Sequence, residues 1–261
     1  MEANNIITYM SANKLAANDD KTHIMVIRRN GKHEEVEINV GSKKIKESAS
    51  EKLLGMWVQN NLRWSTHLIK LERNLKHRLF NLRRLAEQIP RPLLKTIADG
   101  IFMSVLRYGL PAHCPLRLKE EDPNHSSIER IKVVFNDCLR LLTNRKRQDH
   151  GRIEDMLSEL GWLSINQLNA ETRLLEAWKA IHTDGYCMSD LLPVKSKNKH
   201  MSTRSDDETL MEQGQSHKFI NGSFSHRTAQ IWNAAPRGVK EASSIYTAKR
   251  TIRQFVKTLP I

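Results

Sequence analysis

The chain has 261 residues, with 42 Lys or Arg against 29 Asp or Glu, and its formal net charge is +13. An excess of this size favours polyanionic partners, of which nucleic acid is the first and an anionic membrane surface the second. No apolar run approaches the roughly 18 residues of a membrane-spanning helix, and the stretch from Met1 to Met10 is too polar for a secretory signal. We therefore expect an intracellular protein, nuclear or cytoplasmic, that does not bind membranes.

The three cysteines do not suggest a disulfide framework or a zinc site. Cys114, Cys138 and Cys187 are far apart, odd in number and without C-x-x-C spacing. Buried or half-buried free thiols are the expectation.

The first 60 residues alternate between helix and strand signals. The end of a helix is expected over Ile6–Asn13, and a strand over Thr22–Arg29. The dipeptide Asn30-Gly31 favours a tight type I′ turn, because both residues tolerate positive φ. Glu34–Val40 is the expected return strand and Leu53–Val58 a third strand, so a small three-stranded antiparallel sheet is predicted.

After Trp64 the apolar positions recur every three or four residues, as in amphipathic helices. The first helix, with Ser65 or Thr66 as its N-cap, has an apolar stripe formed by Leu68, Leu71, Leu75, Leu79, Leu82, Ala86 and Ile89. Pro90 and Pro92 separate it from a second helix lined by Leu94, Ile97, Ile101 and Val105. A third helix has Ile128, Ile131, Phe135, Cys138, Leu139 and Leu142 on one face.

The C-terminal part contains two further helix signals and one break. Ser164 and Gln167 form a capping-box pattern ahead of a helix with Ile165, Leu168, Leu175 and Trp178. Residues 193–222 are polar and predict a mobile linker. A final helix starting at Ser243 or Ser244 places Ile245, Ala248, Ile252, Phe255, Val256 and Leu259 on one side. The predicted fold class is α+β, predominantly α.

The first long helix concentrates the positive charge. The stripe opposite its leucines holds Lys70, Arg73, His77 and Arg84, and the positions beside that stripe hold Lys76, Arg78 and Arg83. Residues 61–95 contain nine Lys or Arg and two Glu, a local net charge of +7. A solvated face is the ordinary alternative, but such faces mix signs, whereas a phosphate backbone would relieve the repulsion here.

Four stretches follow one another in an informative order. Residues 11–22 read S-A-N-K-L-A-A-N-D-D-K-T. Residues 53–58 read L-L-G-M-W-V and are followed by Asn61-Leu62-Arg63-Trp64 and by His67. The basic helical region then runs from Leu79 to Tyr108-Gly109. Near the C-terminus, Phe224-Ser225-His226-Arg227 precedes Ile231-Trp232-Asn233-Ala234-Ala235-Pro236.

Taken together, these stretches resemble the C-terminal half of the reverse transcriptases of non-LTR (LINE-like) retrotransposons, over nearly the whole chain. The first resembles a palm segment, the second the primer-grip stretch, the third the thumb and the fourth a C-terminal R…W-N-x-L-P signature. Leu54 departs from the pattern, because the family usually has an aromatic or similar residue there.

The resemblance implies a palm remnant with a primer-grip-like segment (1–60), a helical thumb (61–110), a helical connection region (111–192), a linker (193–222) and a C-terminal helical unit (223–261). The primer-grip-like residues are Leu54, Gly55, Met56 and Trp57. The residues expected to bind RNA or DNA are Arg63, Trp64, Lys70, Arg73, Lys76, His77, Arg83 and Arg84. Lys21 matches a family lysine near the phosphates of the incoming nucleotide, and an ordinary surface lysine at the start of a strand is the alternative.

A catalytic site is not expected in this chain alone. Nucleotide addition needs two metal ions held by carboxylates on adjacent strands, and the family's metal-binding segments would lie before Met1. The doublets Asp19-Asp20 and Asp206-Asp207 lack flanking apolar strands. We therefore expect no cofactor here, with Mg²⁺ needed only by an intact enzyme, and no small-molecule ligand.

Three hypotheses follow from these observations. The chain is a reverse transcriptase fragment that binds primer–template without polymerising, or an inactive gene remnant that folds poorly, or a co-opted helical module that binds protein. Among its tryptophans, Trp64 is the one expected to stack on nucleic acid, because it lies at the edge of the basic helix.

Overall fold

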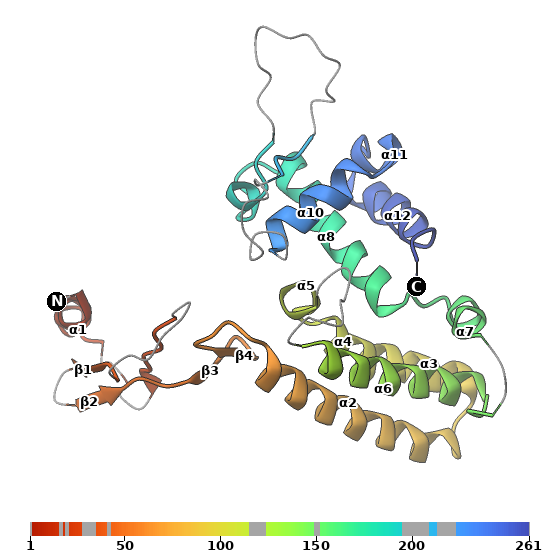
Figure 1. The fold of residues 1–261 in the computed structure, drawn as a ribbon, viewed down its shortest axis with the longest axis horizontal. Helices are drawn as coiled ribbons and strands as arrows, with labels where there is room; N and C mark the ends of the chain where they lie inside the picture. The colour runs from red at the N-terminus through yellow and green to blue at the C-terminus, as the bar shows by residue number, and fades with distance from the viewer. Residues whose placement is uncertain are drawn as a thin grey trace, which may run out of the picture. The chain divides into compact units, whose positions relative to one another are not determined.

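The computed structural model describes residues 2–15, 18, 21–27, 35–40, 43–114, 124–148, 152–194, 209–212 and 223–260. Within these ranges the chain is mostly helical, with two antiparallel sheets of two strands each. This content confirms the predicted α+β, predominantly helical class. The chain divides into two compact units, residues 1–73 and 74–261 (Figure 1).

Before the long helix begins, the described residues of the first unit form one helix and two hairpins. Helix α1 spans Glu2–Ala12, which agrees with the predicted N-terminal helix. Strand β1 (Glu37–Val40) pairs with β2 (Lys43–Lys46). Strand β3 (Ser50–Leu53) pairs with β4 (Met56–Gln59).

The predicted three-stranded sheet is wrong. Residues 22–27 form no strand, and Ile24 makes only an isolated parallel bridge with Glu47. Strand β1 instead pairs with β2, the segment that follows it directly, and closing so short a loop costs less entropy than pairing with a distant segment. Positions 28–34, which include the predicted Asn30-Gly31 turn, lie outside the described residues.

The predicted single strand Leu53–Val58 is also wrong, because the chain reverses within it. Leu53 pairs with Met56, which leaves a two-residue loop of Leu54 and Gly55. Their φ angles are 47° and 86°. Positive φ at both loop positions is the feature of the type I′ turn that matches strand twist. Leucine is rare at such a position, so the sequence pattern did not indicate this turn.

Helix α2 (Ser65–Ala86) starts in the first unit and continues in the second. The buried side chains of its apolar stripe are Leu68, Leu71, Leu75, Leu79 and Leu82, as predicted. The predicted stripe extends too far, because Ala86 and Ile89 are half-buried and Ile89 lies beyond the helix. The predicted N-cap is wrong, because Ser65 and Thr66 are the first residues of the helix. The Gln59 side-chain oxygen accepts hydrogen bonds from the Thr66 backbone N–H and the Ser65 hydroxyl, both at 3.0 Å. A residue that ends strand β4 therefore satisfies the helix N-terminus.

The next helical stretch is continuous but changes its winding. It consists of α3 (Arg91–Ala98), the π-helical turn η2 (Asp99–Met103) and α4 (Ser104–Arg107), followed by α5 (Leu110–His113). Of the predicted lining, only Leu94 is fully buried. The fully buried side chains are Leu94, Ala98, Phe102, Met103 and Leu106. The face is rotated because the π turn inserts a residue into the helical repeat.

Helix α6 (His125–Thr143) buries every side chain of its predicted apolar face, and α7 (Ile153–Leu160) packs against it. The second-unit part of α2 and the α3–α4 stretch lie alongside α6 (Figure 1). The Arg78 guanidinium, for example, donates to the backbone carbonyl of Ile101 at 2.8 Å. Arg78 therefore joins two helices.

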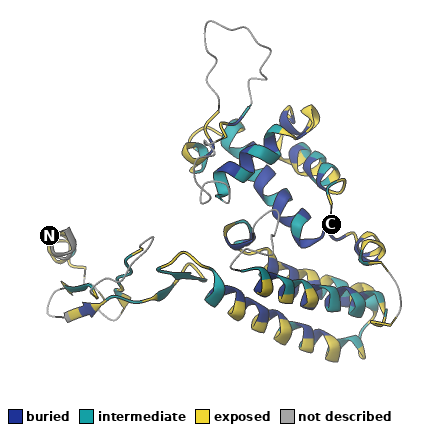
Figure 2. Ribbon diagram, in the orientation of Figure 1, coloured by how far each residue is buried: buried dark blue, intermediate teal, exposed yellow. Residues whose placement is uncertain are grey.

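Helix α8 (Ile165–His182) is followed by the short turn η3 (Ser189–Leu191) and by the remaining described helices of the second unit. They are α10 (Phe224–Asn233), α11 (Arg237–Lys240) and α12 (Ile245–Val256), of which α10 and α12 contact α8 directly. Figure 2 shows buried residues along α8 and α10. The predicted capping box of Ser164 and Gln167 is present with both hydrogen bonds.

Arg173 on α8 is a buried cation that joins three segments of the second unit. Its guanidinium donates to the carbonyl of Pro111 at 2.7 Å, to the Asn169 side-chain oxygen at 3.0 Å and to the carbonyl of Phe224 at 3.1 Å. Burial lowers the pKa of Arg173 to about 10. These neutral acceptors fix the positions of α8 and α10 relative to α5.

Two predictions near the C-terminus need correction. Ser244 caps α12 as expected, but Ile245 is 43% exposed and is not part of the buried face. Within the predicted linker, Leu210 is fully buried and its N–H donates to the side chain of Asn233 at 3.0 Å. Leu210 is therefore packed against the second unit although Met211 and Glu212 are exposed, and 195–208 and 213–222 lie outside the described residues.

The cysteines are unpaired, as expected, but not all of them are buried. Cys114 and Cys138 are buried, whereas Cys187 is exposed. Exposure of Cys187 contradicts the expectation of buried or half-buried thiols.

Candidate nucleic-acid interface

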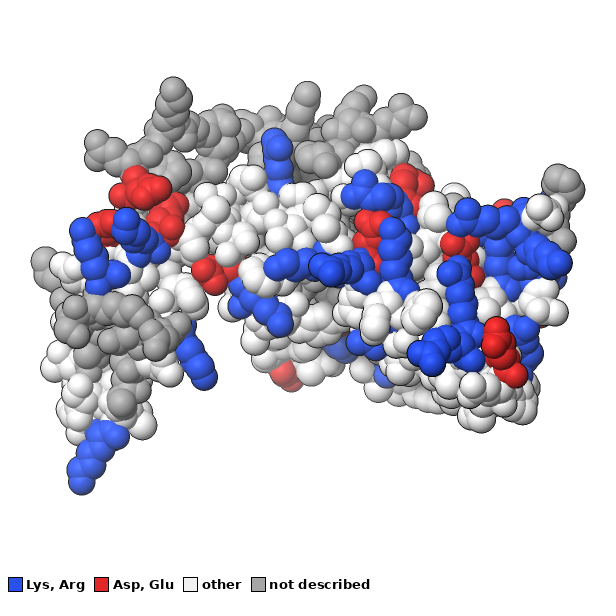
Figure 3. Space-filling view, turned by 90° about the horizontal axis from the view of Figure 1, so that it is seen from below, with Lys and Arg blue, Asp and Glu red and all other residues white. Residues whose placement is uncertain are grey.

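The basic residues predicted on the long helix lie on its solvent-exposed side. Five of them are exposed on α2 away from the buried leucines: Lys70, Arg73, Lys76, His77 and Arg84. Arg83, at the edge of this face, is also exposed. On the face of the second unit seen in Figure 3, Lys and Arg side chains are more abundant than Asp and Glu side chains. We call these six residues the α2 basic face.

The basic side chains of this face differ in the ion pairs and hydrogen bonds that they form within the protein. Arg73 and Arg84 form no ion pair or side-chain hydrogen bond with any residue in the described ranges. Arg83 lies 3.9 Å from the Asp137 carboxylate. The His77 ring nitrogen Nε2 is 3.4 Å from the Asn81 amide nitrogen. Arg73 and Arg84 therefore remain the most available for an external anion.

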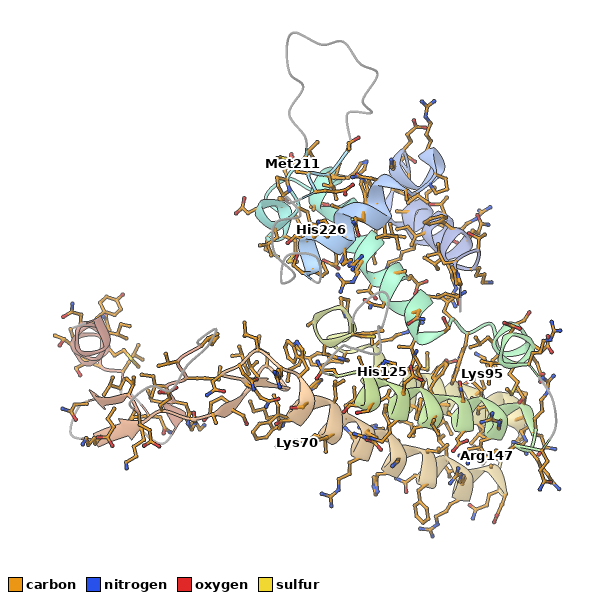
Figure 4. All side chains as sticks on the ribbon, viewed as in Figure 1. Lys70, Lys95, His125, Arg147, Met211 and His226 are labelled. Atoms are coloured by element: carbon orange, nitrogen blue, oxygen red, sulfur yellow. The ribbon has the colours of Figure 1, made fainter. Side chains whose placement is uncertain are left out.

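Lys70 has an aromatic partner within the first unit. Its ammonium lies over the Trp57 ring, 2.9 Å from the ring centroid. Trp57, which was predicted as primer-grip-like, is half-buried, and its backbone N–H points to the His67 ring nitrogen Nδ1 at 3.4 Å. This contact joins strand β4 to the start of α2. Lys70 therefore contributes to local packing as well as to the charge of the face (Figure 4).

Trp64 and Arg63 lie just before α2. The Trp64 ring is half-buried and meets His67 edge to face, with 6.1 Å between ring centroids. His67 is buried, and the desolvation lowers its pKa. The Arg63 side chain is exposed. Part of the Trp64 ring is thus available for stacking, while the rest packs against protein.

The other predicted residues of the first unit lie in the hairpin and in the segment before it. Leu54 and Gly55 form the tip of the β3–β4 hairpin, and Leu54 is 81% exposed. Met56 begins β4 and is half-buried. Lys21 is exposed, and its backbone N–H donates to the Asn18 side-chain oxygen at 3.2 Å.

Sequence reasoning missed one aromatic residue on the basic helix. Phe80 is 56% exposed on α2, and its neighbours four residues away on the same helix are Lys76 and Arg84. An exposed ring between two cations suits the stacking of a base. The available signal was that position 80 falls outside the three-or-four spacing of the leucine stripe.

A second omission concerns the basic run after α6. The sequence reads R-L-L-T-N-R-K-R over residues 140–147, and this clustering could have been noticed. In the structure Arg140 and Arg147 both contact Asp137.

The described part of the chain contains no group of three or more His, Cys, Asp or Glu that could hold a metal ion. Asp19-Asp20 and Asp206-Asp207 lie outside the described residues. His113 is buried next to Cys114, and burial raises the pKa of the Cys114 thiol to about 11. That thiol is therefore a poor metal ligand at neutral pH.

The chain was compared with known families, proteins and structures. No protein-family model, curated protein or solved structure matches it. Among the described helices, none combines the length and the apolar character needed to cross a membrane.

Proposed function

We propose that the chain binds the sugar–phosphate backbone of nucleic acid, without sequence preference, through the α2 basic face. The observation that carries this proposal is the division of α2 into two sides. One side buries five leucines, and the other exposes six basic side chains. Because the leucines hold the helix in place, the cations are presented by a rigid element rather than by a loop.

The charge of this face favours a phosphate partner on physical grounds. Arg73 and Arg84 lack carboxylate partners in the described ranges, so their charges repel those of neighbouring cations. A phosphate backbone relieves the repulsion and releases its own counterions on binding. Phe80 adds an aromatic surface between Lys76 and Arg84 that accepts any base.

We also propose the biological setting that the sequence resemblance implies. The chain would be the part of a non-LTR retrotransposon reverse transcriptase that grips primer–template, with α2 as the thumb helix. The β3–β4 hairpin would lie near the primer end, since it presents Leu54 and Gly55 at its tip. We assign to these residues the binding of primer–template, and we assign no chemical step to them.

The experiment compares two variants that lose the same charge. The double variant Arg73→Gln/Arg84→Gln removes two exposed cations of the α2 basic face. Lys249→Gln/Arg250→Gln removes two exposed cations from α12 and serves as the control. Fluorescence anisotropy with a short labelled RNA–DNA duplex, between about 50 and 200 mM salt, gives the slope of log K against log salt.

We expect the α2 variant to flatten the slope by about 1.8, which is about 0.9 for each lost phosphate contact on duplex DNA. The α12 control should keep the slope of the unmodified protein. Two equal slopes would mean that net charge alone governs binding, and would overturn the α2 assignment. Absence of binding by the unmodified protein would overturn the proposed function as a whole.

A further inference from the structure

Asp137 on α6 gathers three arginines of the second unit. Arg147, beyond the end of the helix, approaches it with two nitrogens, Nε at 3.2 Å from Oδ1 and Nη2 at 2.7 Å from Oδ2. Arg140 contributes Nη1, 3.2 Å from Oδ1. Arg83, in the last turn of α2, brings Nη2 to 3.9 Å from Oδ2. We call Asp137, Arg83, Arg140 and Arg147 the Asp137 cluster.

The Asp137 cluster is not electrically balanced. Three guanidinium groups and one carboxylate carry a net charge of +2. Arg91 adds another cation at the C-terminal end of α6, and among the described residues its guanidinium donates to neutral acceptors only, the carbonyl of Leu141 and the side-chain oxygen of Asn144. A structural ion pair needs one cation for each carboxylate, so the arrangement holds more cations than its internal pairing uses.

The geometry leaves the surplus charge accessible. The Asp137 side chain is 15% exposed, whereas those of Arg83 and Arg147 are 55% and 67% exposed. Each guanidinium has five N–H donors in a rigid fork, and the carboxylate occupies only part of them. Asp137 therefore orients Arg140 and Arg147 by hydrogen bonds and attracts Arg83 by charge alone, and the exposed side chains of Arg83 and Arg147 keep donors that the carboxylate does not occupy. This is a preorganised site for a tetrahedral oxyanion.

The position of the cluster links it to the α2 basic face. Arg83 belongs to both, and Arg84 follows it directly on α2. Arg147 lies beyond the end of α6 (Figure 4), and Figure 3 shows a dense group of basic side chains at one end of the second unit. A nucleic-acid strand bound along the second-unit part of α2 would thus reach the Asp137 cluster at the last turn of the helix.

We propose that the Asp137 cluster is a second phosphate site, which binds one backbone phosphodiester of a nucleic acid lying along α2. This inference rests on the proposed function and extends it from one helix to a surface made by two. The chemistry required is that of phosphate oxygens, which the free donors of Arg140, Arg147 and Arg83 match by fork-like hydrogen bonds.

The first test is a pair of charge-matched double variants assayed with the same labelled duplex. Arg140→Gln/Arg147→Gln should flatten the salt slope by about 0.9 and weaken binding about tenfold at about 0.1 M salt. Arg145→Gln/Lys146→Gln removes two charges from the same segment but leaves the cluster intact, and it should change the slope by less than half as much. If the two double variants flatten the salt slope equally, the inference is overturned, because lost charge and not the geometry around Asp137 would then determine the affinity.

The second test uses the unmodified protein and so does not depend on how the variants fold. Phenylglyoxal modifies exposed arginines, and mass spectrometry reads the extent at each position. The duplex should protect Arg147 as strongly as Arg84, and leave Arg250 on α12 reactive. Protection of Arg84 without Arg147 would overturn the second site and leave the α2 assignment standing. If the duplex protects neither Arg84 nor Arg147, both the second site and the α2 assignment are overturned.

A third measurement distinguishes a backbone phosphate of the duplex from a free phosphate ion. Inorganic phosphate is added in place of the duplex, against chloride at equal ionic strength. We expect it to protect Arg147 far less than the duplex does, because a single free ion lacks the neighbouring contacts along α2. Protection by free phosphate with none by the duplex would assign the site to a free ion and overturn the inference.

Discussion

The thiols of Cys114 and Cys138 are inside the second unit, where water cannot solvate a thiolate. Burial raises the pKa of Cys114 to about 11 and that of Cys138 to about 12, from an ordinary value near 9. For Cys114 the positive charge of Arg173 offsets part of this effect. Both thiols are therefore protonated and unreactive at neutral pH.

These pKa values predict a loss of stability in alkali. Above pH 9 the thiols of the unfolded chain lose their protons while those of the folded chain keep them, so the folded state binds more protons and its stability falls as pH rises. The loss extends from about pH 9 to about 11 for Cys114 and to about 12 for Cys138. Each thiol contributes up to about 1.4 kcal/mol per pH unit.

Urea unfolding at a series of pH values checks this prediction. The variant Cys114→Ala/Cys138→Ala should show a shallower decline of the free energy of unfolding above pH 9 than the unmodified chain. Cys187→Ala is the control and should decline like the unmodified chain, since its thiol is exposed in both states. Identical pH profiles for all three proteins would contradict the assigned burial.

The β3–β4 hairpin has a leucine where its turn favours asparagine. Leu54 adopts φ 47°, a left-handed conformation that costs an L-residue with a branched side chain about 1 kcal/mol or more. Asn-Gly is the preferred sequence for this two-residue turn. We therefore expect Leu54→Asn to stabilise the hairpin by about 1 kcal/mol.

Hydrogen exchange at the hairpin measures the effect locally. The backbone amides of β3 and β4 that are hydrogen-bonded across the pair should exchange about fivefold more slowly in Leu54→Asn, which corresponds to about 1 kcal/mol. Leu53→Asn is the matched control. It places the same side chain in the strand, where asparagine is unfavourable, and should not slow exchange.

The two compact units differ in how much apolar surface they bury. Among the described residues of the first unit, the buried apolar side chains are Ile45, Leu68 and Leu71, and all the others lie in the second unit. Two-stranded hairpins are marginally stable without a core to pack on. The first unit should therefore open at a lower free-energy cost than the second.

Native-state hydrogen exchange on the full chain tests this difference. The amides of β1 to β4 should exchange through openings that cost much less free energy than those of α6 and α8, which approach the global value. Addition of low denaturant should release the first set before the second. Equal protection throughout would mean that the chain unfolds as one cooperative body.

Sequence patterns predicted the structure well wherever one face of a helix is apolar and buried. The leucine stripe of α2, the apolar face of α6 and the capping box of Ser164 were each predicted from spacing alone and are present in the structure. The exposed position of the basic residues on α2 followed from the same spacing, because residues opposite a buried stripe face solvent. Strand pairing was poorly predicted, since it depends on which segments meet and not on local composition.

The sequence by itself determined the charge, the helical class and the side of α2 on which Lys70, Arg73, Lys76, His77 and Arg84 lie. These properties depend on composition and on a periodicity of three or four residues. Tertiary structure alone decided that Gln59 caps α2, that Lys70 rests on Trp57, and that Arg83, Arg140 and Arg147 share one carboxylate. In the last two cases side chains distant in sequence converge because the packing of apolar faces brings their elements together, and helical or strand periodicity contains no information about such meetings.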